Sequence, residues 1–185
     1  MEDNYLKSVK LQFQYYKSLG EKTFDQLHED ELFWQFNDES NSIAITVNHL
    51  WGNMKSRWTD FLTADGEKKW RDRDMEFESV IKSKRELLDK WNEGWDILLN
   101  AINSISKDNF ESEIFIRNQS HSISEALNRQ MMHYAYHIGQ IVYIGRMLKG
   151  KDWKSLSIPK GKSKDFNSKK ISKGKHGGHF TDELM

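Results

Sequence analysis

The sequence predicts an all-α protein, a four-helix bundle that ends in a basic C-terminal tail. Four segments, each of roughly 20–30 residues, repeat apolar side chains at steps of three and four, which is the period of an amphipathic helix. The 185 residues include one proline and few internal glycines, whereas a sheet-rich fold needs more turn residues. A chain of this length can bury a sizeable core as one domain, and modest connections between four helices favour a bundle.

The first helix is predicted over residues 2–28, with a weak point at Gly20. A polar connector follows over residues 29–42, and its aromatic side chains are expected to cover one end of the core. The apolar stripe of the first helix consists of Leu6, Val9, Phe13, Tyr16 and Leu19.

The second helix is predicted to start at Ser40 or Ser42, either of which suits an N-cap, and to end near Gly66. His49 lies one step round from its core stripe, at the edge of the buried face. The connection over residues 64–74 is long, so the up-and-down order of the helices stays open. The core stripe consists of Ile43, Val47, Leu50, Met54 and Phe61.

Residues 67–76 are highly charged and are predicted to form a surface loop before a third helix over about 75–105. The apolar side of that helix includes Phe77, Val80, Ile81, Leu87, Trp91, Trp95, Leu98 and Ile102. Residues 109–122 then break the helical period. We interpret them as either a short two-stranded ribbon or an irregular connector.

The fourth helix is predicted to begin after Ser122 or Ser124, with Glu125 as the capping-box partner. Its apolar period continues through Leu148. Lys149 and the glycine that follows it are expected to end the helix.

We divide the chain into the bundle over 1–150, a segment over 151–167 that packs back on it, and a flexible basic tail over 168–185. Residues 149–175 contain ten lysines and two aspartates, whereas residues 21–39 contain seven acidic residues and one lysine. The basic stretch has little arginine or aromatic content, so nucleic acid is the less favoured partner. A solvated tail, or one docked on the acidic face of its own or a partner chain, is the simpler interpretation.

The chain contains no cysteine, which excludes disulfides and thiolate ligands, so any metal must be held by His, Asp or Glu. Residues 1–5 show neither a basic region nor an apolar run, and no signal peptide is predicted. No stretch approaches 18 consecutive apolar residues, which argues against a membrane span. We therefore expect a cytoplasmic protein that does not bind membranes.

Two histidines of the fourth helix, His133 and His137, are four residues apart and lie on the same face. That face continues through Ile141 and Leu148, so the pair points into the bundle, and His49 leans toward the same interior. A lone interior histidine is more often hydrogen-bonded to a tyrosine, an asparagine or a backbone carbonyl, but three together favour a metal site. Three neutral imidazoles suit Zn, Ni, Fe or Cu and leave a position open for water or substrate.

Of the other four histidines, His28 and His121 lack a helical partner. His28 and His121 are interpreted as surface residues, and His176 and His179 lie in the tail, where only adventitious metal binding is expected. The sequence contains no Gly-x-Ser-x-Gly elbow, phosphate-binding glycine loop or His-Glu-x-x-His motif. No catalytic residue is therefore assigned.

Three motifs occur in order along the chain: Asn-His-Leu-Trp over 48–51, the pair His133-x3-His137, and Ile-Gly-Gln over 138–140. With these motifs the sequence resembles the DinB-like superfamily of metal-binding four-helix bundles over about residues 1–150. Within that superfamily it is similar to a bacterial branch of unassigned function. The stretches that carry this closer similarity extend it to about residue 167 and lie at 49–61, 65–74 and 157–163.

The resemblance implies a divalent metal, most often Zn or Ni, bound by His49, His133 and His137. Characterised relatives are metal-dependent thiol transferases or isomerases that use low-molecular-weight thiols, and others are described as hydrolases. Many members are homodimers. The implied partners are therefore a small-molecule substrate, such as a low-molecular-weight thiol, and a second copy of the chain.

Three hypotheses follow for function. The leading one is a metal-dependent thiol transferase or hydrolase whose ion activates a thiol or a water toward an unknown small molecule. The second is a non-catalytic, stress-associated module that the metal stabilises. The third is an interaction protein whose basic stretch over 149–175 binds a partner.

Four further residues are expected to assist at the metal, namely Asn53, Arg57, Tyr134 and Gln140. Arg57 and Arg73 either bind an anionic group of the substrate or form surface ion pairs with Asp60, Asp72 or Asp74. Surface pairing is the more common outcome for such residues.

Overall fold

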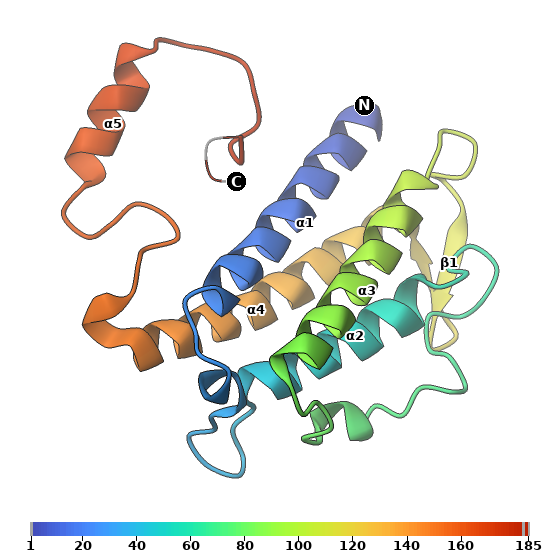
Figure 1. Cartoon of the computed structure of the whole chain (residues 1–185). Coiled ribbons are helices and arrows are strands. Elements are labelled where there is room, and N and C mark those ends of the chain that lie inside the picture. The colour runs from blue at the N-terminus through green and yellow to red at the C-terminus, as the bar shows by residue number, and fades with distance from the viewer. Residues whose placement is uncertain (1, 183, 185) are drawn as a thin grey trace.

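The structure, a computed structural model, describes residues 2–182 and 184, and within them it is mostly helical (Figure 1). The described part contains five α-helices and one two-stranded sheet, in the order α1, α2, α3, β1, β2, α4, α5. None of the described helices is long and apolar enough to cross a membrane. The helices span Glu2–Phe24 (α1), Ile43–Trp58 (α2), Lys84–Asn103 (α3), Ile123–Lys149 (α4) and Ser163–Ser172 (α5).

The four long helices pack as two neighbouring pairs, α1 with α4 and α2 with α3, and α2 also contacts α4. Their apolar stripes meet in one core whose fully buried side chains include Phe13, Leu50, Trp95 and Tyr134. Burying a large apolar side chain contributes about 1.5–3 kcal/mol to stability. This core fixes the contact between α2 and α4, the two helices that carry the predicted metal ligands.

Helix α1 ends at Phe24, earlier than the predicted end at residue 28, because its last turn tightens. The Leu27 N–H donates to the carbonyl of Phe24, three residues back, at 3.2 Å. The helix passes through Gly20 without a break. A Cβ at Gly20 would lie 2.4 Å from Cη2 of Trp91, so the glycine lets α3 approach α1 closely.

Helix α2 begins after Ser42, one of the two predicted caps, but it ends at Trp58 and not near Gly66. Asp60 adopts a left-handed backbone conformation with φ of 48°, which turns the chain away from the helix axis. Gly66 does not end the helix; it lies in the loop after α2, where the side chain of Arg57 packs closely against it. Its N–H donates to the carbonyl of Phe115 at 2.8 Å.

Helix α3 begins at Lys84, later than the predicted start near residue 75, because Ser83 is its N-cap. Met75–Phe77 forms a single 3-10 turn, η2, and an irregular segment connects that turn to the cap. Ile81 in this segment is buried in the core. Its apolar side chain therefore reaches the core from a loop, although its spacing in the sequence is that of a helix.

A short hairpin precedes α4, so the two-stranded ribbon forms and the irregular connector does not. Strands β1 (Glu113–Ile116) and β2 (Gln119–Ser122) pair antiparallel. Arg117 and Asn118 form the turn, with φ angles of 56° and 60°, as two-residue hairpin turns of type I′ require. Two buried isoleucines of β1 attach the hairpin to the core.

Helix α4 follows the sequence prediction at both ends. Ser122 is its N-cap and forms a complete capping box with Glu125. Gly150, with φ of 53°, follows its last residue, Lys149. Both ends are determined by residues adjacent in sequence, which is why a local pattern could predict them.

After α4 the chain returns toward α1. The backbone of Lys154 exchanges two hydrogen bonds with the side chain of Gln26, of 2.8 and 3.2 Å. Helix α5, which the sequence does not predict, lies apart from the four long helices in Figure 1 and contains no buried residue. A helix that buries nothing has no apolar period to predict it. Further on, Thr181 is buried and Nε2 of His179 lies 3.0 Å from Oγ of Ser8.

Candidate functional site

The three histidines predicted from the sequence lie together between α2 and α4. His49 belongs to α2, and His133 and His137 lie one turn apart on α4. Nε2 of His133 is 3.3 Å from Nε2 of His49 and 3.1 Å from Nε2 of His137. One nitrogen from each ring lies within 4.8 Å of the others, which lets all three reach a single ion. No other group of three potential metal ligands occurs among the described residues.

Hydrogen bonds on the far side of two rings determine how those rings face the centre. Nδ1 of His49 lies 2.8 Å from Oε2 of Glu76, and Nδ1 of His137 lies 2.8 Å from Oε1 of Gln140. Both oxygens only accept hydrogen bonds, so each Nδ1 carries the proton and each Nε2 presents a lone pair to the centre. Such a partner on the far nitrogen is typical of histidines that bind metals.

Glu76 comes from the 3-10 turn η2, inside the stretch that the sequence predicts to be a surface loop, yet it is 5% exposed. Two hydrogen bonds from Arg71, of 2.7 and 2.9 Å, hold its carboxylate. Asn48 donates to its backbone carbonyl at 3.0 Å. A Cβ at Gly52 would lie 2.5 Å from its Oε1. Helix α2 therefore supplies three parts of the site: His49 itself, Asn48, which holds the backbone of the loop, and Gly52, which leaves space for the carboxylate of Glu76.

At neutral pH the site combines the neutral imidazoles of His133 and His137 with an ionised carboxylate. Burial, with smaller contributions from His137 and His49, lowers the pKa of His133 to about 3. Burial lowers the pKa of His137 to about 4, against the opposing effect of its own hydrogen bond. Burial acts to raise the pKa of Glu76, but hydrogen bonds from His49 and Arg71 outweigh burial and hold that pKa below its usual range. Neutral imidazole is the form of histidine that binds a metal.

The four residues expected to assist the metal fall into two groups. Asn53 and Arg57 line the cavity beside the histidines. Tyr134 is fully buried behind it, where its hydroxyl donates to Oδ1 of Asn53 at 3.0 Å and accepts from Nε1 of Trp58 at 3.1 Å. Gln140 acts through the imidazole that it orients. Tyr134 and Gln140 therefore support lining residues and do not line the cavity themselves.

A cavity of about 400 Å³ lies beside the histidines, between α2, α4, the loop before α3 and the hairpin. Its lining is strongly positive, because it includes five arginines and no carboxylate. The lining residues are His49, Asn53, Arg57, Arg71, Arg73, Phe77, Arg117, Arg129, Gln130, His133, Tyr136 and His137.

The surface ion pairs considered for Arg57 and Arg73 do not form within the described part of the chain. Ion pairs around the cavity connect Arg71 and Arg117 to glutamates. The guanidinium of Arg73 lies 5.1 Å from the centre of the Phe77 ring. Arg57 is buried, and no described residue forms a hydrogen bond with its Nε or Nη1 atom.

The other four histidines do not join the site. His28 and His176 are exposed. His121 places Nδ1 2.9 Å from the carbonyl of Gln119, and His179 contacts α1. In the sequence, His28 and His121 differ from the group between α2 and α4 because they lack a helical partner, and His176 and His179 differ because they lie in the tail.

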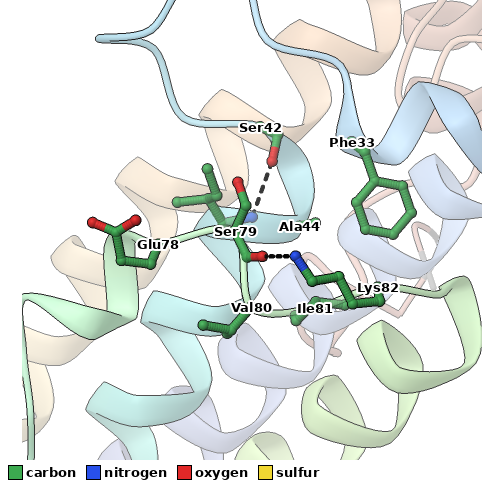
Figure 2. Close-up of a pocket in the computed structure, with 9 residues that line it drawn as sticks. Phe33, Ser42, Ala44, Glu78, Ser79, Val80, Ile81 and Lys82 are labelled. Carbon is green, nitrogen blue, oxygen red and sulfur yellow. Dashed lines mark hydrogen bonds between the residues drawn. The ribbon is translucent and has the colours of Figure 1, made fainter.

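A second cavity, of about 250 Å³, lies where the irregular segment after η2 passes the start of α2 (Figure 2). Two of its polar side chains are already engaged, since Ser42 caps α2 and the ammonium of Lys82 bonds to the carbonyl of Ser79. Apolar side chains such as Phe33 and Val80 form much of the remaining wall. No histidine lines this cavity among the described residues.

Sequence reasoning missed Glu76 and Arg71, which together orient His49. Their stretch is rich in charge, and a charged stretch is most often a solvated loop. The acid lies 27 residues from the histidine that it contacts, so no local spacing connects the two. Gly52 is the available signal, because a glycine inside a helix needs a packing reason.

The region that contains this site is similar to a known protein family. No curated protein matches the chain. A family of proteins of unknown function, DUF1572, matches residues 1–162, a range that includes the three histidines, Glu76 and the arginines of the cavity. Because the match covers most of its length, the chain belongs to the family described as protein of unknown function, DUF1572.

Proposed function

We propose that the protein is a divalent-metal-binding member of the DinB-like superfamily, a four-helix bundle in which His49, His133 and His137 hold the ion. The observation that carries the proposal is the convergence of three Nε2 atoms, with contacts of 3.1 and 3.3 Å, while partners on Nδ1 orient two of the rings. A proton on Nε2 of His133 can satisfy only one of the two lone pairs that face it. An ion satisfies all three.

Zn or Ni is the proposed metal. The donor set consists of imidazole nitrogens, which suit both ions, and the chain has no cysteine to supply a thiolate. Calcium and magnesium prefer oxygen ligands, and no carboxylate among the described residues belongs to this group of three histidines.

We propose further that the site acts on a small molecule, as a thiol transferase or a hydrolase. A divalent ion on three imidazoles keeps open positions and, when bound, lowers the pKa of a water or a thiol. The protein's own residues contribute orientation, since Glu76 and Gln140 keep two rings in the ligating tautomer. The cavity of about 400 Å³ suits a small molecule, and use of a thiol rests on the superfamily resemblance.

A metal-stabilised, non-catalytic module is the second candidate, because the same three histidines connect α2 to α4. A bound ion at that point would cross-link two helices of the core and stabilise the fold without any turnover. The two candidates share the metal and differ in whether the cavity binds a reactant.

Metal content tests the shared part of the proposal. Untagged wild-type protein, equilibrated with Zn²⁺ or Ni²⁺ and then dialysed, is expected to retain about one ion per chain in elemental analysis. His137→Ala removes one ligand and its oriented tautomer, so it should lose the ion and the thermal stabilisation that the ion provides. His28→Ala, at an exposed histidine, is the matched control and should retain both.

Two outcomes would contradict the metal proposal. One is wild-type protein without stoichiometric metal, and the other is a His137→Ala variant with unchanged metal content and melting temperature.

An activity assay distinguishes the enzyme from the stabilised module. Metal-loaded protein is assayed with a low-molecular-weight thiol and an electrophile, and with an activated ester. Turnover that His137→Ala lacks supports an enzyme, whereas metal binding without turnover supports the stabilised module.

A further inference from the structure

Arg57 carries a buried charge beside the histidines, and it forms no ion pair with any described residue, although Glu67 and Asp65 act on it from a longer distance. The residue is 6% exposed, and its Nε and Nη1 atoms are buried without a hydrogen-bond partner. Burial lowers the pKa of Arg57 to about 10, so the guanidinium remains charged at neutral pH. An unpaired charge in this position is strongly unfavourable, and a bound anion would compensate it.

The neighbouring arginines add positive charge to the same cavity. Arg71 and Arg117 have glutamate partners. Arg73 lies over a phenylalanine ring and Arg129 donates to a histidine nitrogen, and neither has a carboxylate partner within the described residues. Of the three guanidinium groups of the cavity that pair with no described carboxylate, Arg73 and Arg129 are exposed to solvent and only Arg57 is buried.

Two carboxamides in the same wall also have unused hydrogen-bonding capacity. Gln130 is 2% exposed, and its Oε1 is buried without a partner. Oδ1 of Asn53 accepts from Tyr134, which leaves the Nδ2 donors of Asn53 for a bound molecule. These groups would hydrogen-bond polar atoms next to the anion.

We propose that this part of the cavity binds an oxyanion, the carboxylate or phosphate group of a small molecule, with Arg57 as its main ligand and Arg73 and Arg129 beside it. The planar guanidinium donates two parallel hydrogen bonds to either group. That this molecule is the substrate rests on the proposed function, because Arg57 and the histidines line one cavity. Binding of the oxyanion itself requires no metal.

A titration of the metal-free wild-type protein tests the proposal. Inorganic phosphate and acetate are compared with chloride at equal ionic strength, so that general screening is subtracted. We expect a saturable rise in melting temperature of roughly 5–10 °C at about 100 times the dissociation constant. The stronger of the two responses identifies a tetrahedral phosphate or a planar carboxylate as the preferred group.

Arg57→Met removes the charge at similar side-chain volume. It is expected to melt no lower than the wild type in chloride and to lose the response to phosphate and acetate. Arg85→Met on α3, where the side chain is 93% exposed, is the matched control and should keep the response. If Arg57→Met does not fold, Arg57→Lys takes its place, and the loss of two-pronged geometry should weaken binding about tenfold or more.

The proposal is overturned if neither oxyanion stabilises the wild type more than chloride does, or if both Arg57 variants respond as the wild type does. A Zn²⁺ titration of the same proteins separates this proposal from the metal site. A wild type that responds to an oxyanion but binds no metal supports the anion site and removes the metal proposal. A wild type that binds metal and ignores both oxyanions does the reverse.

Discussion

At the scale of single residues, the candidate site depends on Gly52, whose lack of a side chain leaves space for Glu76. A Cβ at Gly52 would lie 2.5 Å from Oε1 and 2.7 Å from Cδ of Glu76, closer than real contacts allow. The carboxylate cannot simply move aside, because His49 and Arg71 hold both of its oxygens. A glycine destabilises a helix interior by about 1 kcal/mol relative to alanine. At position 52 the missing side chain leaves the space that the buried carboxylate of Glu76 occupies.

Gly52→Ala is expected to displace Glu76, to lower the free energy of unfolding by about 1–3 kcal/mol and to weaken metal binding about 10–100-fold. Gly139→Ala on α4 is the matched control, because a Cβ there meets nothing within 4 Å. It should stabilise the protein by about 0.5–1 kcal/mol. Urea denaturation and competition for Zn²⁺ measure both effects. Unchanged metal affinity in Gly52→Ala would show that Glu76 does not orient His49.

At the scale of elements, the hairpin is attached to the loop after α2 mainly through Asp65. Its carboxylate accepts hydrogen bonds from the backbone N–H groups of Arg117 at 2.9 Å and Asn118 at 2.7 Å. The N–H of Gly66 adds a bond to the carbonyl of Phe115. Through this attachment the hairpin turn brings the Arg117 side chain to the wall of the cavity.

The pKa of Asp65 gives this attachment a defined dependence on pH. Burial acts to raise the pKa of Asp65, but backbone hydrogen bonds from Asn118, Glu67 and Arg117 outweigh burial and hold that pKa below its usual range. The carboxylate therefore stabilises the fold fully above the unfolded-state pKa of about 4. This contribution is lost as pH falls through the lower folded-state value.

Asp65→Asn exchanges one accepting oxygen for an NH₂ group and should lower the free energy of unfolding at pH 7 by about 1–2 kcal/mol. The difference from the wild type should shrink as pH falls from about 4 through the lower folded-state pKa, where the carboxylate of the folded wild type becomes protonated. Denaturant unfolding across this pH range measures it. Asp96→Asn, at an exposed position of α3, should change little at any pH. An Asp65→Asn deficit that persists in acid would rule out the charge as its cause.

At the scale of the whole molecule, α4 presents apolar side chains to solvent as well as histidines to the interior. Met132, Tyr136, Tyr143 and Met147 are between 45% and 69% exposed. Their spacing of four, seven and four residues places them on one side of the helix. The homodimer that the DinB-like resemblance implies remains a prediction, and this stripe is the face on which we expect a second copy to pack.

Light scattering during gel filtration tests that prediction. The wild type is expected to elute as a dimer, and Tyr143→Glu as a monomer, because a charge in the middle of an apolar interface would be buried without a partner. Trp70→Glu changes another exposed aromatic residue, outside α4, and should leave the dimer intact. A monomeric wild type, or a dimeric Tyr143→Glu variant, would place the interface elsewhere or exclude it.

The helical character of the chain could be predicted because it depends on local patterns. The period of the apolar residues predicted the four long helices, and Ser122 with Glu125 predicted where α4 begins. Predictions from local patterns were wrong at helix ends that depend on contacts with distant parts of the chain. The apolar run before Ser83 has helical spacing, yet it forms a loop that fills the core. The end of α2 depends on the turn at Asp60, which no apolar period predicts.

The sequence by itself determined which residues could be metal ligands. It contains no cysteine, and two of its histidines share a helix face by their spacing alone. Only the tertiary structure decided that His49 meets this pair and that Glu76 orients His49. It also decided that Arg57 lies buried in the same cavity with no ion-pair partner among the described residues. These features arise from contacts between residues 27 or more positions apart and from exclusion of water, and neither leaves a periodic trace in the sequence.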